Sequence, residues 1–374
     1  MVYKKKNSFI NLTGEKNVSV KLILNKIEKL DISNSKQFND KQKKIFLKIK
    51  DELLFKTNNE FNLTNNIIDE LNITDLDDWP NYLIHRYRYE VYPDKKILDE
   101  YPPYLQIEPS SICNYRCVFC FETDKSFTTK KNGYMGTMKI DLFKDIIDKA
   151  KGNIEFISLA SRGEPLVNPE FEEMIKYTDG KFLNLKINTN ASLLNESKCH
   201  AILSSGVKTL VFSADAADEK LYSKLRVNGK LKIVLKNIEL FNSIKEKDYK
   251  KKKIITRVSG VKYSDEQNFQ EMEKFWKSLV NQVAFVEYNP WENIYIQKPN
   301  NINTSCSDLW RRMFIWWDGK VNPCDTDYKS TLQIKKYNGD LSETWLSENY
   351  QLIRNKHLND KRQSLKPCRS CNVI

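Results

Sequence analysis

The 374-residue sequence has no long apolar run and contains only three histidines. Its densest apolar cluster, Met313 to Trp317, is far shorter than the roughly 20 residues that a membrane helix needs. A hydrophilic stretch follows the basic start Met-Val-Tyr-Lys-Lys-Lys, where a secretory signal would have an apolar core. We therefore expect a cytoplasmic protein that contacts no membrane. His85, His200 and His357 are isolated, and we assign none of them to catalysis.

The chain is basic, with 61 Lys and Arg against 49 Asp and Glu and a net charge of +12. Such an excess can indicate a nucleic-acid partner or an acidic substrate. Here the basic residues are mostly lysines, scattered among many Asn and Ile rather than gathered in one stripe. This distribution favours a compositional bias of the whole chain and argues against a nucleic-acid partner.

At about 150 residues per domain, the length predicts two or three domains. In residues 1–100 the apolar side chains mostly recur at helical spacing, which predicts a mainly helical N-terminal region. This region carries no recognisable chemistry. Tyr101-Pro-Pro103 then breaks the pattern and indicates a boundary near residue 100.

Short apolar runs alternate with amphipathic helical patterns between about residues 104 and 290. Six runs are typical of strands: Leu105–Glu108, Ile154–Leu159, Phe182–Asn188, Thr209–Ser213, Ile254–Ser259 and Val283–Glu287. Six strand–helix repeats predict an α/β fold with a parallel sheet. Right-handed crossovers would curl this sheet into a partial (βα)6 TIM-like barrel, and we expect it to span residues 101–295.

Residues 296–374 are expected to form a small, cysteine-clamped domain of one β-hairpin and one helix. Asp318-Gly319 separates two strand-like runs, which is a strong signal for a two-residue hairpin turn. Asp340 and Glu343 fit a capping box that would open a helix from Leu341 to His357.

Seven of the eight cysteines fall into two groups with the spacing of metal ligands. The first group is Cys113, Cys117 and Cys120, and the second is Cys306, Cys324, Cys368 and Cys371. Disulfide frameworks are typical of short secreted chains, and this chain is neither short nor visibly secreted. The pattern therefore indicates metal or iron–sulfur binding.

The first cysteine group, Cys113-x3-Cys117-x2-Cys120, closely follows the first predicted strand. This places it at the mouth of the barrel formed by the carboxyl ends of the strands, where such folds carry their chemistry. Three thiolates can hold three irons of a [4Fe-4S] cluster and leave the fourth iron open to a small molecule. A structural zinc site would need a fourth ligand, and no His or further Cys lies near in the sequence.

This motif, with the aromatic Phe119 before its last cysteine, resembles that of the radical S-adenosylmethionine (SAM) superfamily. Further along, Ser161 to Pro169 is similar to the family's Gly-Gly-Glu-Pro segment, which holds the methionine amino group of SAM. Arg162 replaces the first glycine. The resemblance implies that Phe119, Gly163 and Glu164 take part in binding SAM.

Three later segments extend this resemblance. Asn188 to Ala191 is similar to the family's Thr-Asn-Gly turn, with Asn190 matching its asparagine and an alanine in the glycine place. Ser213 and Asp215 match a Ser-x-Asp-Gly stretch whose polar side chains reach the ribose or the carboxylate of SAM. Arg226 stands where relatives carry an arginine, and we expect it to bind the carboxylate.

The second cysteine group can be assembled by the predicted hairpin and helix. The hairpin can bring Cys306 and Cys324 together, and the helix can return Cys368 and Cys371 to them. Four thiolates saturate a [4Fe-4S] cluster, although a four-cysteine zinc site has similar spacing. This region resembles the SPASM/twitch extension of radical SAM enzymes. Its four cysteines match the shorter twitch form, which implies one second [4Fe-4S] cluster.

The resemblance implies an oxidoreductase that cleaves SAM to a 5′-deoxyadenosyl radical, which takes a hydrogen atom from the substrate. An electron donor such as flavodoxin or ferredoxin would be needed, and the second cluster could accept an electron during oxidation of a sugar or cyclitol alcohol. The alternatives are a maturase-type enzyme that modifies a peptide and an RNA-modifying enzyme. We therefore expect a small-molecule or peptide substrate, contacted by one of Glu287, Tyr288, Asn289 and Trp291, and identify no catalytic base.

Overall fold

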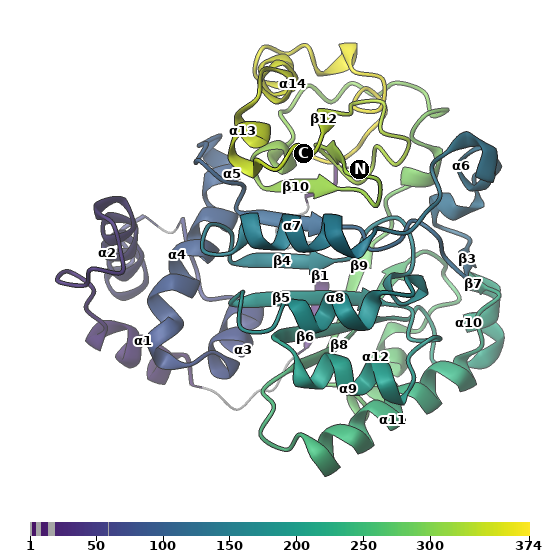
Figure 1. Ribbon diagram of the computed structural model, residues 1–374, viewed down its shortest axis with the longest axis horizontal. Coiled ribbons are helices and arrows are strands. Elements are labelled where there is room, and N and C mark those ends of the chain that lie inside the picture. Colours follow the sequence, from purple (N-terminus) through teal and green to yellow (C-terminus); the bar gives the residue numbers. More distant parts are fainter. Residues whose placement is uncertain (1, 5–8, 14–18, 59) are drawn as a thin grey trace.

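The computed structural model describes residues 2–4, 9–13, 19–58 and 60–374. One sheet runs through this part of the chain, in the strand order β1-β9-β8-β6-β5-β4-β2-β10-β11-β12 (Figure 1). Its two edge strands, β1 and β12, come from the two ends of the chain. They do not pair with each other, so the curved sheet stays open. No helix among these residues is long and apolar enough to cross a membrane.

Six parallel strands form the barrel, and they are the six that the sequence predicts. They are β2 (Tyr104–Ile107), β4 (Phe156–Leu159), β5 (Asn184–Thr189), β6 (Val207–Ser213), β8 (Ile255–Lys262) and β9 (Gln282–Glu287). Each pairs in parallel with its neighbours in the barrel. The predicted α/β partial barrel is therefore confirmed, with differences of up to three residues at the strand ends.

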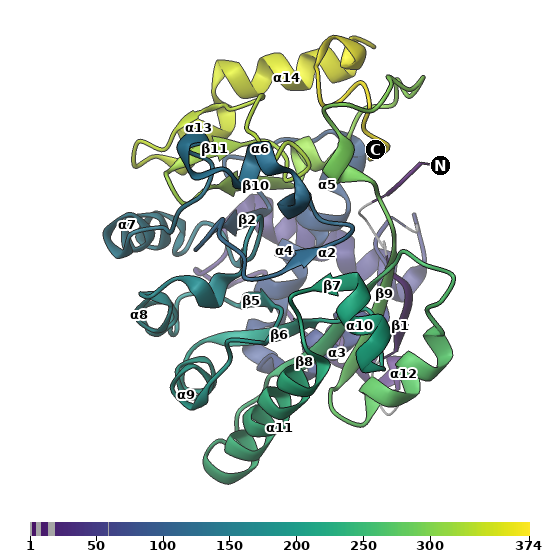
Figure 2. The same ribbon diagram turned by 90° about the vertical axis from the view of Figure 1, so that its right-hand side faces the viewer.

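Helices cover the outer face of the barrel (Figure 2). They are α7 (Ile140–Ala150), α8 (Phe171–Tyr177), α9 (Glu196–Ser204), α10 (Glu219–Leu225), α11 (Leu231–Asp248) and α12 (Phe269–Lys277). In α7, Phe143, Ile146, Ile147 and Ala150 are fully buried because their spacing places them on one face. Short elements cross the mouth of the barrel: β3 (Arg116–Cys117), α6 (Lys125–Thr128) and β7 (Arg226–Val227).

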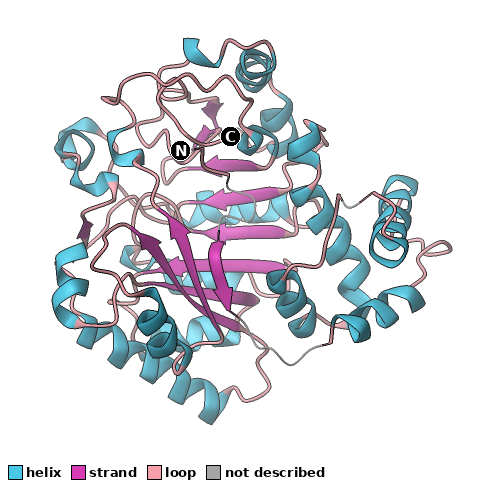
Figure 3. Ribbon diagram, turned by 180° about the vertical axis from the view of Figure 1, so that it is seen from behind, coloured by secondary structure: helices cyan, strands magenta, loops and turns pink. Residues whose placement is uncertain are grey.

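The N-terminal region packs at the amino ends of the barrel strands (Figures 1 and 3). Its elements are β1 (Phe9–Thr13), α1 (Val20–Lys29), α2 (Asp40–Phe55), α3 (Asn65–Ile73), α4 (Trp79–Glu90) and α5 (Tyr92–Lys95). They have their own apolar cluster, which Tyr104 and Phe156 join to the barrel. The sequence did not predict β1, which pairs antiparallel with β9. An edge strand takes its stability from pairing with a distant segment, which leaves little local signal.

The C-terminal region contains β10 (Arg312–Ile315), β11 (Lys320–Asn322), β12 (Lys335–Lys336), α13 (Leu341–Leu346) and α14 (Glu348–Leu358). The hairpin around Asp318-Gly319 is confirmed, but its loop is longer than the two residues expected, because Ile315 pairs with Val321 and the Trp316 N–H donates to the Lys320 carbonyl oxygen. β10 also pairs in parallel with β2, which extends the barrel sheet. The single helix predicted over Leu341–His357 is wrong. Ser347 is extended, with ψ of 155°, and separates α13 from α14.

Candidate active site

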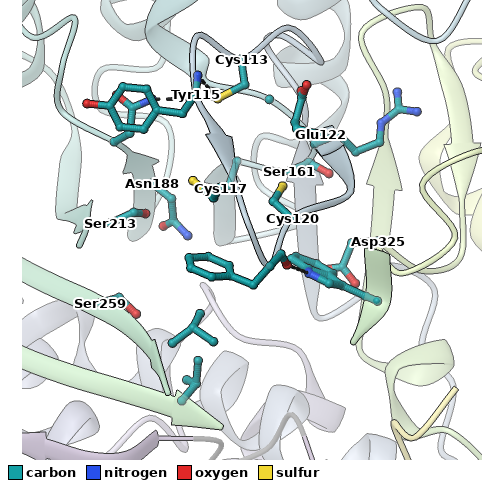
Figure 4. Close-up of a pocket in the computed structure, with 18 of the residues that line it drawn as sticks. Cys113, Tyr115, Cys117, Cys120, Glu122, Ser161, Asn188, Ser213, Ser259 and Asp325 are labelled. Carbon is teal, nitrogen blue, oxygen red and sulfur yellow. Dashed lines mark hydrogen bonds between the residues drawn. The ribbon is translucent and has the colours of Figure 1, made fainter. Parts of the chain in front are cut away.

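A cavity of about 400 Å³ opens at the carboxyl ends of the barrel strands, which matches the usual size of a small-molecule site. Polar side chains from successive strand ends face it, including Ser161, Asn188, Ser213 and Ser259 (Figure 4). The predicted residues that line it are Cys113, Cys117, Cys120, Phe119, Gly163, Glu164, Asn190, Ser213, Arg226, Glu287, Tyr288, Asn289 and Trp291. The fold thus brings together side chains that lie up to 178 positions apart in the chain.

The three thiols of the first cysteine group are free and share this cavity (Figure 4). Cys117 is held by the ladder between β3 and β7, where it lies opposite Arg226, and Arg226 Nη1 is 3.8 Å from its sulfur. The backbone N–H of Tyr115 donates to Cys113 Sγ at 3.4 Å. Burial raises the pKa of the Cys117 thiol, while the charge of Arg226 lowers it. Such buried thiols lose their protons readily only to a strongly bound cation, which fits an iron cluster.

Glu164 is the buried carboxylate of the site, with an exposure of 2%. Its Oε1 accepts hydrogen bonds from the Thr189 hydroxyl at 2.6 Å and the Leu166 N–H at 3.1 Å, and its Oε2 accepts from the Asn190 N–H at 2.7 Å. Burial raises its pKa, and these hydrogen bonds counteract the rise. The network joins the loop after β4 to the end of β5 and fixes the orientation of the carboxylate.

Asn190 connects this network to the cysteine loop. Its Nδ2 donates to Asn114 Oδ1 at 2.9 Å and lies 4.0 Å from Cys113 Sγ. The following residue, Ala191, has a left-handed φ of 61°, which explains why a glycine suits this place in similar sequences.

Asp215 does not lie on the cavity lining, in contrast to the expectation that it reaches SAM. Its Oδ2 lies 2.6 Å from Arg226 Nε, its Oδ1 accepts from the Val261 N–H at 2.6 Å, and the residue is fully buried. The reason is that β6 ends at Ser213, so Asp215 already points back toward β8 and the guanidinium. Asp215 therefore positions Arg226, which does line the cavity.

Several lining residues were not predicted: Tyr115, Glu122, Asn188, Ser259, Asp325 and Thr326. The sequence contained a signal for two of these residues, because Asn188 and Ser259 are each the last residue of a predicted strand. Within β5, Asn188 also lies on the same face of the strand as Lys186. Asp325 and Thr326 directly follow Cys324, yet only the fold shows that the second cysteine region reaches the same cavity (Figure 4).

The four cysteines of the second group also come together. Burial raises the pKa of the Cys368 thiol, and the neighbouring thiolates of Cys371, Cys324 and Cys306 raise it further. Backbone N–H groups donate to two of the sulfurs, Thr326 to Cys324 at 3.2 Å and Val373 to Cys371 at 3.4 Å. Hydrogen bonds to the sulfurs are one means by which proteins tune the potential of an iron–sulfur cluster.

Arg362 holds the segments around this second group in place. It is buried, and it donates to the carbonyl oxygens of Cys368 at 3.2 Å, Cys371 at 2.6 Å and Thr304 at 2.7 Å. His357 Nδ1 accepts from the Cys306 N–H at 3.2 Å. In the residues that the structure describes, no three His, Cys, Asp or Glu side chains are grouped to hold one metal ion. The donor set of four thiols fits a cluster that spans several irons.

One family model matches the barrel with the first cysteine group, and another matches the C-terminal region with the second cysteine group. Residues 107–275 match the radical SAM superfamily, and residues 306–372 match SPASM, an iron–sulfur cluster-binding domain. The chain therefore belongs to the radical SAM superfamily and carries a C-terminal SPASM domain. These domains imply three cofactors: a SAM-binding [4Fe-4S] cluster, an auxiliary [4Fe-4S] cluster and SAM.

Curated relatives match only parts of the chain. A tungsten-containing aldehyde ferredoxin oxidoreductase cofactor-modifying protein of Pyrococcus furiosus is 32% identical over 114 residues, which is 30% of either protein. A GTP 3′,8-cyclase of Clostridium botulinum is 25% identical over 244 residues, 63% of this chain and 69% of the relative. The chain thus spans 30% and 69% of the lengths of these two relatives, and the matches do not define its substrate.

Among solved structures, SuiB of Streptococcus suis bound to S-adenosylmethionine resembles this chain with a TM-score of 0.52. The alignment covers 88% of this chain and 82% of SuiB, at 19% identity. At this identity the likeness concerns the fold, and it extends through most of the chain.

Proposed function

We propose that this radical SAM enzyme oxidises an alcohol carbon of a sugar or cyclitol, with the second cluster as electron acceptor. The observation that supports it most is that Asp325 and Thr326, directly after Cys324, line the same cavity as Cys113 and Cys117. The polypeptide around the second cysteine group thus forms part of the wall around a substrate. An acceptor beside the reacting carbon is what a two-electron oxidation without nicotinamide needs.

In this proposal the first cysteine group holds the SAM-binding cluster, and Glu164 holds the amino group of SAM. A carboxylate has about four lone-pair sites, and three of those on Glu164 accept from Thr189, Leu166 and Asn190. One site remains for a charge-assisted hydrogen bond from an ammonium group. Arg226 lines the cavity and would bind the carboxylate of SAM. Bound together, the cluster and SAM would supply a 5′-deoxyadenosyl radical once an electron donor such as flavodoxin or ferredoxin had reduced the cluster.

The substrate would lie between the SAM site and the loop after β9. Trp291 Nε1 donates to the Phe119 carbonyl oxygen at 3.0 Å, which ties this loop to the cysteine motif. Tyr288 donates to Glu292, which orients the phenol. A secondary alcohol becomes a ketone when it loses the hydrogen atom on its carbon to the radical, its hydroxyl proton to a base and one electron to the second cluster. Asp325 and Thr326 offer oxygen atoms that can bind that hydroxyl group.

A peptide substrate is the alternative that similar enzymes make reasonable. A maturase of this kind would use an N-terminal peptide-binding domain with about three strands. In the described part of residues 1–100 there is one strand pairing with the barrel, β1, among helices α1 to α5. This arrangement favours a small-molecule substrate over a peptide substrate. An RNA substrate would instead require a complex whose affinity falls steeply with salt.

The test is to incubate the reconstituted enzyme with SAM, a reductant and cyclitols deuterated at the hydroxyl-bearing carbons. We expect deuterium in 5′-deoxyadenosine and a product that has lost one deuterium and one hydrogen from the labelled substrate. A Cys306→Ala/Cys324→Ala variant should still form 5′-deoxyadenosine and should lose the ketone. Cys199→Ala, which removes a buried thiol of α9 instead, is the matched control and should retain both. Equal ketone formation in the double variant would refute the proposal.

A further inference from the structure

A second cavity, of about 370 Å³, lies at the opposite end of the barrel, beneath the N-terminal helices. Four cationic side chains line it: Arg86 from α4, Lys186 from β5, Arg257 from β8 and Arg312 from β10. The carboxylates that line it are Glu70 and Glu90. The lining of this cavity is therefore positively charged. Arg312 also lines the cavity of the SAM site, so it stands between the two.

Only one of the four cations has an ionic partner within the lining. Arg86 pairs with Glu90 at 2.7 Å. Glu70 accepts instead from neutral groups, the Tyr82 hydroxyl at 2.5 Å and Asn66 Nδ2 at 3.1 Å. Its charge is thus stabilised by dipoles, and the described residues form no ion pair with it.

The two other arginines contact neutral oxygens. Arg257 Nε donates to Gln282 Oε1 at 2.7 Å, and its Nη2 donates to Asn66 Oδ1. Arg312 Nη2 donates to the Tyr89 hydroxyl at 2.6 Å, and its buried Nε has no hydrogen-bond acceptor among the described residues. Neither guanidinium group forms an ion pair with the described residues, and only more distant carboxylates stabilise their charges: Glu70 and Asp69 that of Arg257, and Asp308 that of Arg312.

Lys186 completes the group. Its ammonium lies 5.8 Å from the centre of the Tyr104 ring, and the described residues offer it no ion pair or hydrogen bond. Burial, together with the charges of Arg312 and Arg257, lowers its pKa to about 8. Cations in a space of low dielectric constant repel one another strongly and are costly unless an anion joins them.

We propose that this cavity binds a small molecule through an oxyanionic group, a phosphate or a carboxylate, held by Lys186, Arg257 and Arg312. Guanidinium and ammonium groups form their strongest hydrogen bonds with these oxyanions. Tyr89 and Tyr104 form an aromatic wall beside the charges, with ring centres 5.5 Å apart. The N-terminal helices would then have a binding role. This inference goes beyond the proposed function and does not depend on it.

The test is calorimetric titration of the reconstituted full-length enzyme with inorganic phosphate and, separately, with succinate, at constant ionic strength in chloride. We expect saturable binding of at least one anion, and the two titrations distinguish a phosphate site from a carboxylate site. Lys186→Met and Arg257→Gln should each weaken binding by at least about tenfold, since removing one partner of a buried charged pair costs several kcal/mol. Lys232→Met, an exposed change of equal charge on α11, should leave binding unchanged.

Thermal unfolding provides a second measurement, which can also be made on a variant of reduced stability. The binding anion should raise the melting temperature of the wild type and of Lys232→Met, and should raise that of Lys186→Met much less. If Lys186→Met does not fold, Lys186→Gln takes its place. The proposal is overturned if neither anion binds saturably to the wild type. It is also overturned if folded Lys186 and Arg257 variants bind as tightly as the wild type.

Discussion

Gly163 occupies a space that admits no side chain. A Cβ atom built on it would lie 2.5 Å from the Ser110 carbonyl oxygen and 2.6 Å from the Ile112 carbonyl oxygen, and these backbone atoms cannot rotate away. The next residue, Glu164, donates its N–H to the same Ile112 oxygen at 3.0 Å. The close approach of the two loops at Gly163 therefore sets the position of the Glu164 carboxylate.

We expect Gly163→Ala to lower the free energy of unfolding by about 1–3 kcal/mol, the usual cost of overpacking, and to weaken SAM binding. Gly206→Ala is the matched control, because its nearest atom would lie at 3.4 Å and its backbone needs no left-handed φ. It should change stability by less than about 1 kcal/mol. Denaturant titration and equilibrium binding of SAM measure both effects. Equal stability of the two variants would contradict this account of the loop.

Between elements, the pair of Glu108 and Arg162 joins the barrel to the C-terminal region. Arg162 Nε and Nη2 each lie 2.7 Å from one carboxylate oxygen of Glu108, and both residues are buried. Arg162 also donates to the Tyr328 carbonyl oxygen at 2.8 Å, and its guanidinium lies 4.3 Å from the centre of the Trp316 ring. The side chain that replaces a family glycine thus connects the loop after β4 with the SPASM domain.

Arg162→Met and Glu108→Gln should each destabilise the protein by about 3–5 kcal/mol, because each leaves a buried partner without its charge or hydrogen bonds. The double variant should cost less than the sum, with a coupling of about 0.5–3 kcal/mol, in a denaturation cycle. Lys144→Met, which breaks an exposed pair with Glu173, should change stability little. If the losses in free energy of unfolding of the two single variants add up to that of the double variant, Glu108 and Arg162 do not act as a pair.

The sequence predicts elements whose signal is local and misses contacts that form only between distant elements. The six barrel strands and α7 follow from apolar spacing, and the turn at Asp318-Gly319 follows from its residue types. No local pattern indicates that β1 pairs with β9, that β10 pairs with β2, or that Asp215 binds Arg226. The Cys113–Cys120 motif located the site, whereas the contribution of Asp325 needed the fold.

On the scale of the whole molecule, both ends of the chain meet beside the SAM cavity (Figures 1 and 2). Tyr3 lines that cavity and bridges to Val373, next to the last cysteines. The barrel separates this cavity from the cationic cavity beneath the N-terminal helices. The N-terminal, barrel and C-terminal segments at 1–100, 101–295 and 296–374 thus share one sheet, and these boundaries remain predictions.

The central claim is that the chain holds two separate iron–sulfur clusters, and it is tested by counting metal when one site is removed. In a chain with Cys113, Cys117 and Cys120 all changed to alanine, anaerobic reconstitution should leave about four irons and about four sulfides bound. These would be held by the second cysteine group. Retention of zinc without iron would contradict the claim, because the SPASM domain would then carry no electron acceptor.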